Sequence, residues 1–229
     1  MRPNDTETHF DDYIRHRAAL MPVGAQDNIT PELIQEQPVV FLTPVGSDTV
    51  DGFVGRDEFS EIKDSLKKPI KGKQSIFSFV NISGDHWNLV EHVYTNTAAG
   101  EWVEKSIDCK KDGACGVHAM VNAILNNTYL KEKYGINADA EQARLSLKDQ
   151  SSQSMPNAIN FIINILSRRD QNDEEKKKTI TKLTKLKDTN GASEHWVDGG
   201  DIEIFSKALG IVSCNRNKLA TPDQQYKNI

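Results

Sequence analysis

Cys115 has the clearest chemical potential in the sequence, because it ends the run Asp112-Gly113-Ala114-Cys115 and stands directly before a helical pattern. That pattern is an apolar stripe at helical spacing, formed by Val117, Met120, Val121, Ile124 and Leu125. At about 100° per residue, Cys115 falls on the opposite side of the helix, at its first turn. A helix N-terminus lowers the pKa of a thiol, which favours a thiolate nucleophile. The alternative is a small apolar residue that only packs.

His86 and Asn88 could complete a nucleophilic site, because a thiol needs a base and the base needs an orienting partner. Both lie in a predicted strand, where positions i and i+2 share a face. Asn88 can therefore accept from one imidazole nitrogen while the other nitrogen faces the thiolate. One predicted hairpin joins this strand to Cys115. The alternative is that His86 is a half-buried strand histidine without a chemical role.

The other histidines are placed less well for this role. His118 lies one turn behind Cys115 on the same helix, where its ring points sideways. The rest lie in a loop, at the far end of the His86 strand and in the N-terminal arm: His195, His92, His9 and His16. Cys109, Cys115 and His118 lack a standard zinc spacing, so no metal site is expected. No phosphate loop or dinucleotide fingerprint indicates a cofactor.

The elements that position these residues differ between the two halves of the chain. Alternating and β-branched runs predict strands at residues 39–43, 75–82, 86–94 and 102–107, and a further strand begins at Ile211. Helical patterns predict helices at residues 8–20, 31–37, 57–66, 129–134, 139–147, 157–167 and 201–209, the last with Gly210 as its C-cap. We therefore expect an α/β (α+β) fold with a small central sheet flanked by helices.

Residues 1–35 are expected to form an N-terminal helical arm, and residues 36–229 the domain that carries the candidate site. Within that domain, the charged segment 168–187 has only a thin apolar stripe of Ile180, Leu183 and Leu186. This pattern predicts a solvated helix or an interaction arm. Its lysines are interleaved with acids, so they do not indicate nucleic-acid binding.

Composition and charge exclude several classes of protein. The chain has 229 residues, of which 37% are hydrophobic and 27% charged, as is typical of a soluble globular protein with a core. Its formal net charge of -5 argues against a dedicated nucleic-acid binder. No run has the length of a transmembrane helix, and the N-terminus shows no signal-peptide pattern. Three cysteines without framework spacing indicate a reducing compartment such as the cytoplasm.

Three motifs of the chain also occur together in one known family. Asp112-Gly113-Ala114-Cys115 fits a DGxC motif, and His86-Trp87-Asn88 fits a His-aromatic-Asn/Asp strand. Residues 196–211 fit a tryptophan/glycine loop, an amphipathic helix and a following strand, although an immediate Trp-Gly pair is missing. Together, over residues 75–212, these motifs resemble the ovarian-tumour (OTU) class of cysteine deubiquitinases.

The resemblance implies a papain-like α/β core that hydrolyses ubiquitin isopeptide bonds without a cofactor. Cys115 would attack the carbonyl of the ubiquitin C-terminal glycine, His86 would move the proton and Asn88 would hold the imidazole. Backbone N–H groups of Cys115 and of the loop Asp112, Gly113 and Ala114 would form the oxyanion hole.

The resemblance also implies ubiquitin or polyubiquitin as the partner of a monomeric enzyme. Trp87 would line the channel for the Gly-Gly tail. Trp196, Asp198 and Glu203 would contact ubiquitin, whose C-terminal tail carries arginines.

The order of the motifs departs from the usual family arrangement, in which the histidine strand comes last. Here His86 precedes Cys115, and no histidine follows Cys214. Circular permutation accounts for this order and resembles the permuted OTU enzymes of bacterial effectors, which would act in the host-cell cytosol. If the permutation is real, the strand that begins at Ile211 must share a sheet with the His86 strand.

Two other functions remain open from the sequence. His86-Trp87 followed by Cys115-Gly116 also resembles the clan of SUMO proteases and adenovirus-type proteases, which includes acetyltransferases. No glutamine lies between His86 and Cys115 to serve as that clan's oxyanion donor. The third possibility is a catalytically inactive ubiquitin-binding module.

Overall fold

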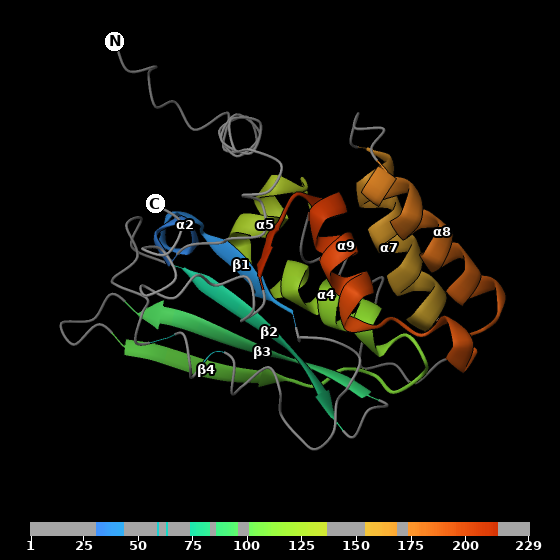
Figure 1. The fold of residues 1–229 in the computed structure, drawn as a ribbon, viewed down its shortest axis with the longest axis horizontal. Coiled ribbons are helices and arrows are strands. Elements are labelled where there is room, and N and C mark those ends of the chain that lie inside the picture. The colour runs from blue at the N-terminus through green and yellow to red at the C-terminus, as the bar shows by residue number, and fades with distance from the viewer. Residues whose placement is uncertain are drawn as a thin grey trace, which may run out of the picture.

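A five-stranded mixed sheet forms the centre of the fold. The computed structural model describes residues 31–43, 59, 63, 74–82, 86–95, 101–136, 154–168 and 174–214. The strands are β1 (Val39–Leu42), β2 (Ser75–Ile82), β3 (His86–Thr95), β4 (Glu101–Ile107) and β5 (Val212–Cys214), in the spatial order β4-β3-β2-β1-β5 (Figure 1). β2, β3 and β4 form an antiparallel meander, whereas β1 is parallel to both β2 and β5. The predicted α/β (α+β) class is confirmed.

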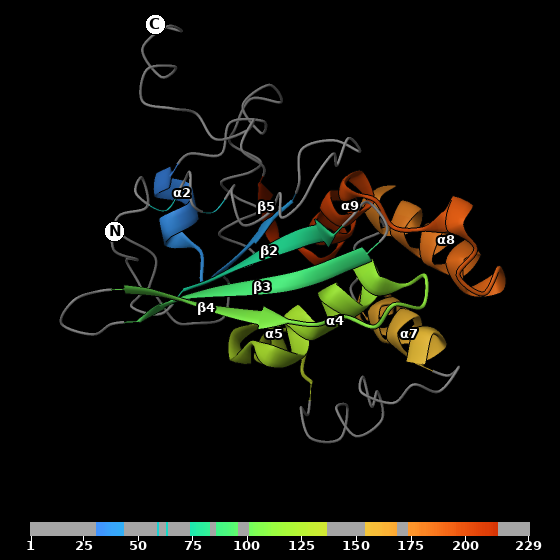
Figure 2. The same ribbon diagram turned by 90° about the horizontal axis from the view of Figure 1, so that it is seen from below.

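Helices form a layer over one face of this sheet. They are α4 (Cys115–Asn126), α5 (Thr128–Lys133), α7 (Ser154–Ser167), α8 (Glu174–Asp188) and α9 (Gly199–Leu209), with a 3-10 turn at Ser193–His195. α4 packs against β3 and β2, α7 packs against α4, and α8 packs against both α7 and α9. The short helix α2 (Pro31–Glu36) lies across the sheet from α4 (Figure 2). Within the described residues, no helix has the length and apolar character needed to cross a bilayer.

The helix that carries Cys115 is buried over its whole circumference. Every residue of α4 from Cys115 to Leu125 is buried, because the sheet covers one side and α7 another. The single predicted stripe is therefore too narrow, and the Cys115 side chain is only 6% exposed. Two polar side chains on α4 point inward, and both have partners: His118 contacts Asp112, and Asn122 donates to the sulfur of Cys109.

The strand that follows Ile211 lies in the same sheet as the His86 strand, as the motif order predicts. It joins the sheet through β1, where Val40 pairs with Val212. The four strands predicted in the first half are confirmed to within one residue at each end. The predicted C-cap is also confirmed, because Gly210 ends α9 in the left-handed conformation with φ of 66°.

The outcome for the remaining helices depends on which residues the structure describes. Helices predicted near residues 31–37, 129–134, 157–167 and 201–209 are confirmed. The helices predicted at 8–20 and 139–147 lie outside the described residues, as does most of 57–66. Of the predicted arm, residues 31–35 are described. There Ile34 is buried and its carbonyl accepts from the Gln74 side chain, so this end of the arm is packed against the sheet.

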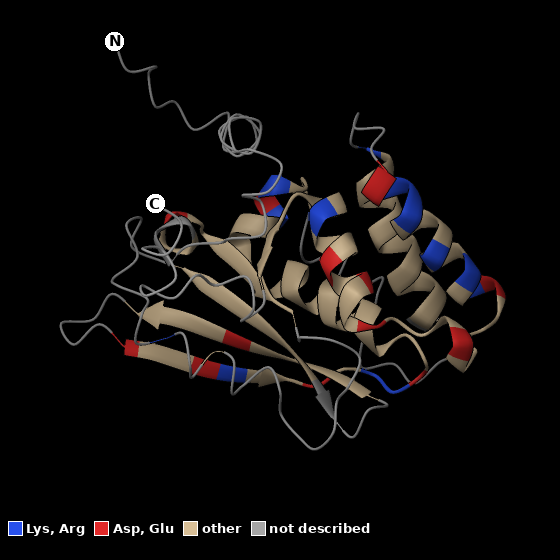
Figure 3. Cartoon of the chain, viewed as in Figure 1, with Lys and Arg blue, Asp and Glu red and all other residues tan. Residues whose placement is uncertain are grey.

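The charged helix α8 contributes one narrow face to the core and leaves the rest exposed or half-buried, so the solvated helix with a thin apolar stripe is confirmed and the free interaction arm is wrong. Its lysines lie along the helix as the blue segments of Figure 3. Thr179, Leu183 and Leu186 are buried on the side that faces α7 and α9, and Ile180 of the predicted stripe is only half-buried. Lys182 pairs with Asp201 of α9 at 2.8 Å. A thin stripe suffices here because two helices pack against it.

Replacing Leu183 with alanine should lower the free energy of unfolding by about 2–5 kcal/mol, because a cavity would form between α8 and its neighbours. Thr181→Ala, on the exposed side of the same helix, should change it by less than about 0.5 kcal/mol. Urea unfolding followed by circular dichroism measures both values. Equally small effects of the two substitutions would show that α8 is not part of the core.

Candidate active site

The thiol of Cys115 lies against the main chain of β3. The backbone N–H of Trp87 donates to Cys115 Sγ, with 3.3 Å between nitrogen and sulfur. The pairing of β3 with β4 ends at Leu89 and Ile107, so the first residues of β3 extend past β4. The chain after β4 turns back at this point and starts α4 there. The end of β4 therefore sets the place of the thiol.

The carbonyl group of His86 belongs to the same peptide group as the Trp87 N–H that contacts the thiol. The Trp87 nitrogen is bonded to the carbonyl carbon of His86, about 1.3 Å away, so the main chain of His86 lies next to the thiol. His86 Nδ1 is buried and has no hydrogen-bond partner among the described residues. An unpaired buried polar atom costs about 1–3 kcal/mol, and a chemical role is one explanation for such an atom. No hydrogen bond among the described residues joins the imidazole to Cys115 Sγ, so the pairing of the predicted nucleophile with the predicted base stays a prediction.

Asn88 shares a face of β3 with His86, since the two pair with Val80 and Ile82 of β2. Its Oδ1 accepts from the backbone N–H of Cys109 at 3.1 Å. Asn88 therefore ties the link between β4 and α4 to β3. In the described part of the chain, no hydrogen bond joins it to His86, and its role in orienting the imidazole stays a prediction.

The loop before Cys115 is held by the carboxylate of Asp112. Its Oδ1 accepts from the backbone N–H of Ala114 at 3.1 Å. Gly113 between them has a φ of 81°, which favours glycine. The Ala114 N–H is thus already used, which leaves the N–H groups of Cys115 and Gly116, at the first turn of α4, as candidate oxyanion donors. Gly116 is a candidate that the sequence interpretation missed.

His118 also belongs to this loop, and the sequence interpretation missed that too. Its Nε2 lies 3.1 Å from Oδ1 and 3.0 Å from Oδ2 of Asp112. The sequence does contain a signal for this pair: Asp112 stands just before the predicted helix and His118 lies in its first turn, so the two side chains can reach each other.

Burial raises the pKa of the Cys115 thiol above its ordinary value. The N–H groups of Trp87, Gly116 and Cys115 itself act in the opposite direction, and the charge of Asp112 raises the pKa further. The expected lowering by the helix N-terminus is therefore wrong in net direction, because desolvation outweighs the amides. The raised pKa favours the protonated thiol over the thiolate.

The loop between α8 and α9 packs directly onto the site. The Trp87 indole N–H donates to the carbonyl of Val197 at 2.8 Å. A Cβ at Gly113 would lie 2.5 Å from the carbonyl oxygen of Gly191, and a Cβ at Gly116 would lie 2.9 Å from Val197. Glycine at these positions allows this close approach.

The residues predicted to contact ubiquitin have different surroundings. Trp196 is 38% exposed beside Gly113, and its indole N–H donates to the Gly191 carbonyl at 2.8 Å. Trp87 is only 5% exposed, so its ring belongs mainly to the core under the site. Asp198 accepts from the Asp201 amide and caps α9, and Glu203 pairs with Lys207 at 2.9 Å.

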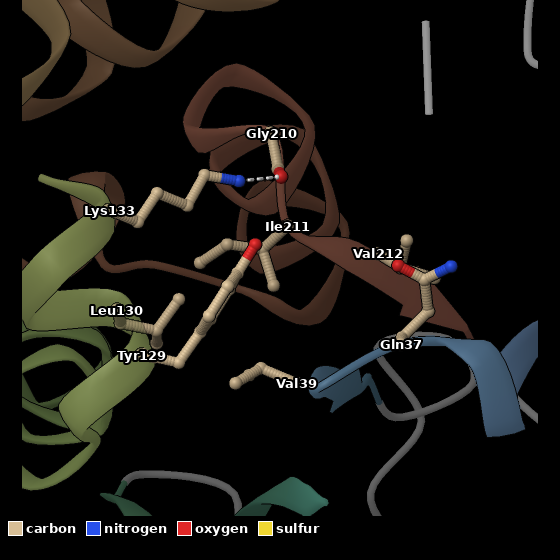
Figure 4. Close-up of a pocket in the computed structure, with 8 residues that line it drawn as sticks. All are labelled: Gln37, Val39, Tyr129, Leu130, Lys133, Gly210, Ile211 and Val212. Carbon is tan, nitrogen blue, oxygen red and sulfur yellow. Dashed lines mark hydrogen bonds between the residues drawn. The ribbon is translucent and has the colours of Figure 1, made fainter. Parts of the chain in front are cut away.

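A pocket elsewhere on the molecule is separate from this site. It lies between α5, β1 and the start of β5, where Lys133 Nζ donates to the Gly210 carbonyl at 2.7 Å (Figure 4). None of the catalytic candidates lines it. In the described ranges, no group of three or more His, Cys, Asp or Glu side chains could hold a metal ion. No family model, curated protein or solved structure matches the chain.

Gly113→Ala should disturb the site more than Gly135→Ala, although both glycines have positive φ, of 81° and 62°. A Cβ at Gly135 would meet no atom within 4 Å, in contrast to the clash at Gly113. The Gly135 variant should lose about 1–2 kcal/mol of stability through its backbone conformation alone. The Gly113 variant should lose more and should change the rate at which iodoacetamide alkylates Cys115. Matching losses and matching alkylation rates would contradict the close contact with Gly191.

The stability of the protein should fall as the pH rises above the ordinary thiol pKa of about 8.5. Burial raises the pKa of Cys109 to about 12, so the unfolded chain loses this proton at lower pH than the folded chain does. Cys109→Ala should remove about 1 kcal/mol of this decline per pH unit above the ordinary value. Urea unfolding under reducing conditions at pH 8, 9 and 10 gives both slopes. Parallel slopes in wild type and variant would rule out this contribution.

Proposed function

We propose that this protein is a cysteine deubiquitinase of the OTU type with permuted motif order, which hydrolyses ubiquitin isopeptide bonds through Cys115, His86 and Asn88. One observation carries the proposal: the Trp87 amide donates to Cys115 Sγ, and the adjacent His86 has a buried Nδ1 without a partner among the described residues. A nucleophile and a base at a helix N-terminus are the groups that acyl transfer requires.

The proton moves through His86 in each half of the reaction. His86 takes the proton of Cys115 as the sulfur attacks the carbonyl carbon of the ubiquitin C-terminal glycine. The oxyanion accepts hydrogen bonds from the N–H groups of Cys115 and Gly116. The imidazolium then gives its proton to the lysine amine, which leaves. Water, deprotonated by His86, attacks the thioester, and the released thiolate regains its proton as the ubiquitin carboxylate departs.

The arrangement of the elements supports a papain-like interpretation. A buried helix begins with the cysteine and packs on a sheet in which an antiparallel strand carries the histidine. The presence of β3 and β5 in one sheet fits a permuted order of strands. The sequence lacks the glutamine that the SUMO-protease clan would need between His86 and Cys115.

Ubiquitin approaches past the loop between α8 and α9. The exposed Trp196 beside Gly113 provides an apolar contact for the ubiquitin tail, and Asp198 and Glu203 offer carboxylates to its arginines. Trp87 supports the wall of the Gly-Gly channel from inside through Val197. The enzyme acts as a monomer in a reducing cytosol, that of the host cell if the protein is a bacterial effector.

Cys115→Ser should abolish hydrolysis of diubiquitin and of a fluorogenic ubiquitin C-terminal substrate, because the hydroxyl is a far weaker nucleophile at this site. A ubiquitin C-terminal propargylamide should modify wild type at Cys115 and not at Cys109 or Cys214, which mass spectrometry reads directly. Turnover that survives in Cys115→Ser would refute the assignment. Binding without modification would indicate an inactive module, and reaction with a SUMO probe alone would indicate the SUMO-protease clan.

His86→Ala should lower kcat by about 100-fold or more, as expected for loss of a general base. Asn88→Ala should cost less, because an orienting group is easier to replace than a base. His195→Ala, in the 3-10 turn on the other side of the loop, is the matched control and should retain activity. An active His86→Ala enzyme would show that another group removes the thiol proton.

A further inference from the structure

We propose that His118 is a positioning residue that holds the nucleophile loop, residues 112–115, through the carboxylate of Asp112. The inference rests on the proposed hydrolase function for its kinetic consequence only. His118 does not reach substrate, because its side chain is 1% exposed behind the loop. It acts on the orientation of the peptide groups next to the sulfur.

The contacts of His118 and Asp112 enclose Ala114 from both sides. Asp112 Oδ1 accepts from the Ala114 N–H at 3.1 Å, while His118 Nε2 holds both oxygens of the same carboxylate. The backbone N–H of His118 donates to the Ala114 carbonyl at 2.9 Å. The main chain at position 118 thus holds the Ala114 carbonyl, as in any helix, whereas the imidazole acts on the Ala114 amide through Asp112.

This enclosure sets the direction of an oxyanion donor. The Ala114 carbonyl and the Cys115 N–H belong to one planar trans peptide, so fixing the carbonyl fixes the N–H in the opposite direction. That N–H is also one of the amides that act on the Cys115 thiol, next to which an oxyanion would form. A rotation of this peptide would remove the donor without moving the sulfur far.

The loop needs such a constraint for two reasons. α4 has no side-chain cap at Ala114, so the usual polar anchor of a helix start is missing there. Gly113 has a φ of 81° and gives the loop the freedom to rotate that other residues lack. The carboxylate of Asp112 supplies the anchor, and His118 fixes the carboxylate.

Glutamine and asparagine at position 118 form a matched pair of tests. The amide nitrogen of glutamine is as many bonds from Cα as Nε2 is, whereas that of asparagine reaches only as far as Nδ1. His118→Gln should therefore keep kcat within about threefold of wild type. His118→Asn should lower kcat by about 100-fold, the effect of a small misplacement at a reacting centre, with KM within about twofold. Both kinetic constants are measured with a fluorogenic ubiquitin C-terminal derivative as the substrate.

Hydrogen exchange at the Ala114 amide gives a readout that needs no substrate. Exchange should accelerate in His118→Asn and remain slow in His118→Gln. Ser206→Ala removes another buried hydrogen bond, from Ser206 Oγ to the Ile202 carbonyl in α9, and is the control for stability alone. It should lower the melting temperature without changing kcat or the exchange at Ala114.

The outcomes separate this inference from the proposed function. Absence of ubiquitin cleavage by wild type would refute the function, and the exchange rates at Ala114 would still decide the role of His118. If wild type is active and the two His118 variants share the same kcat and the same exchange rate, the positioning role is refuted. Equal loss of kcat in both variants, with slow exchange at Ala114, would show a packing role instead.

Discussion

The unequal length of two neighbouring strands is the constraint on which the site depends. β3 continues past the last residue of β4, and its amides at Trp87, beyond that residue, and at Leu89, opposite it, meet sulfur atoms. Cys115 accepts from the first amide, and Cys109 lies against the second. Because sulfur is a weak acceptor, these contacts neutralise little of the cost of burial, and the pKa of both thiols is raised. The same strand edge thus places the Cys115 sulfur and favours its protonated form.

A second constraint comes from the helical half of the chain, which meets the site through main-chain atoms. Gly113 and Gly191 approach so closely that a side chain on either would strike backbone of the other loop. The Trp87 indole then joins this contact to β3 through Val197. Backbone contacts of this kind vary little with side-chain motion, so the position of the Cys115 loop relative to α9 is fixed by shape. The exposed Trp196 is held beside Gly113, where its indole N–H donates to the Gly191 carbonyl.

Local patterns in the sequence predict the strands and most helices, because alternation and helical spacing depend on neighbours in the chain. They fail where tertiary packing decides. In α8, Thr179 is buried while Ile180 is only half-buried. The apolar stripe of α8 does not indicate from which side α7 and α9 pack against it. Asn88 and His86 share a strand face as predicted, yet Asn88 bonds to the link after β4, whose path cannot be read from strand spacing. The sequence patterns also fail to predict the pair of His118 and Asp112, because this contact depends on how the loop enters the helix.

Sequence separation suggests how the site is assembled. Trp87 and Cys115 are 28 positions apart, whereas Trp87 and Val197 are 110 apart. Closing the shorter loop costs less conformational entropy, and the intervening residues form the β3–β4 pairing that stabilises the closed state. Cys115 and His86 therefore belong to one continuous segment from β2 to α4, which carries its own antiparallel strands and its central helix. The loop between α8 and α9 packs onto this segment from a distant part of the chain. The long-range contact combines the Trp87 indole and the Val197 carbonyl with glycines that allow close backbone approach.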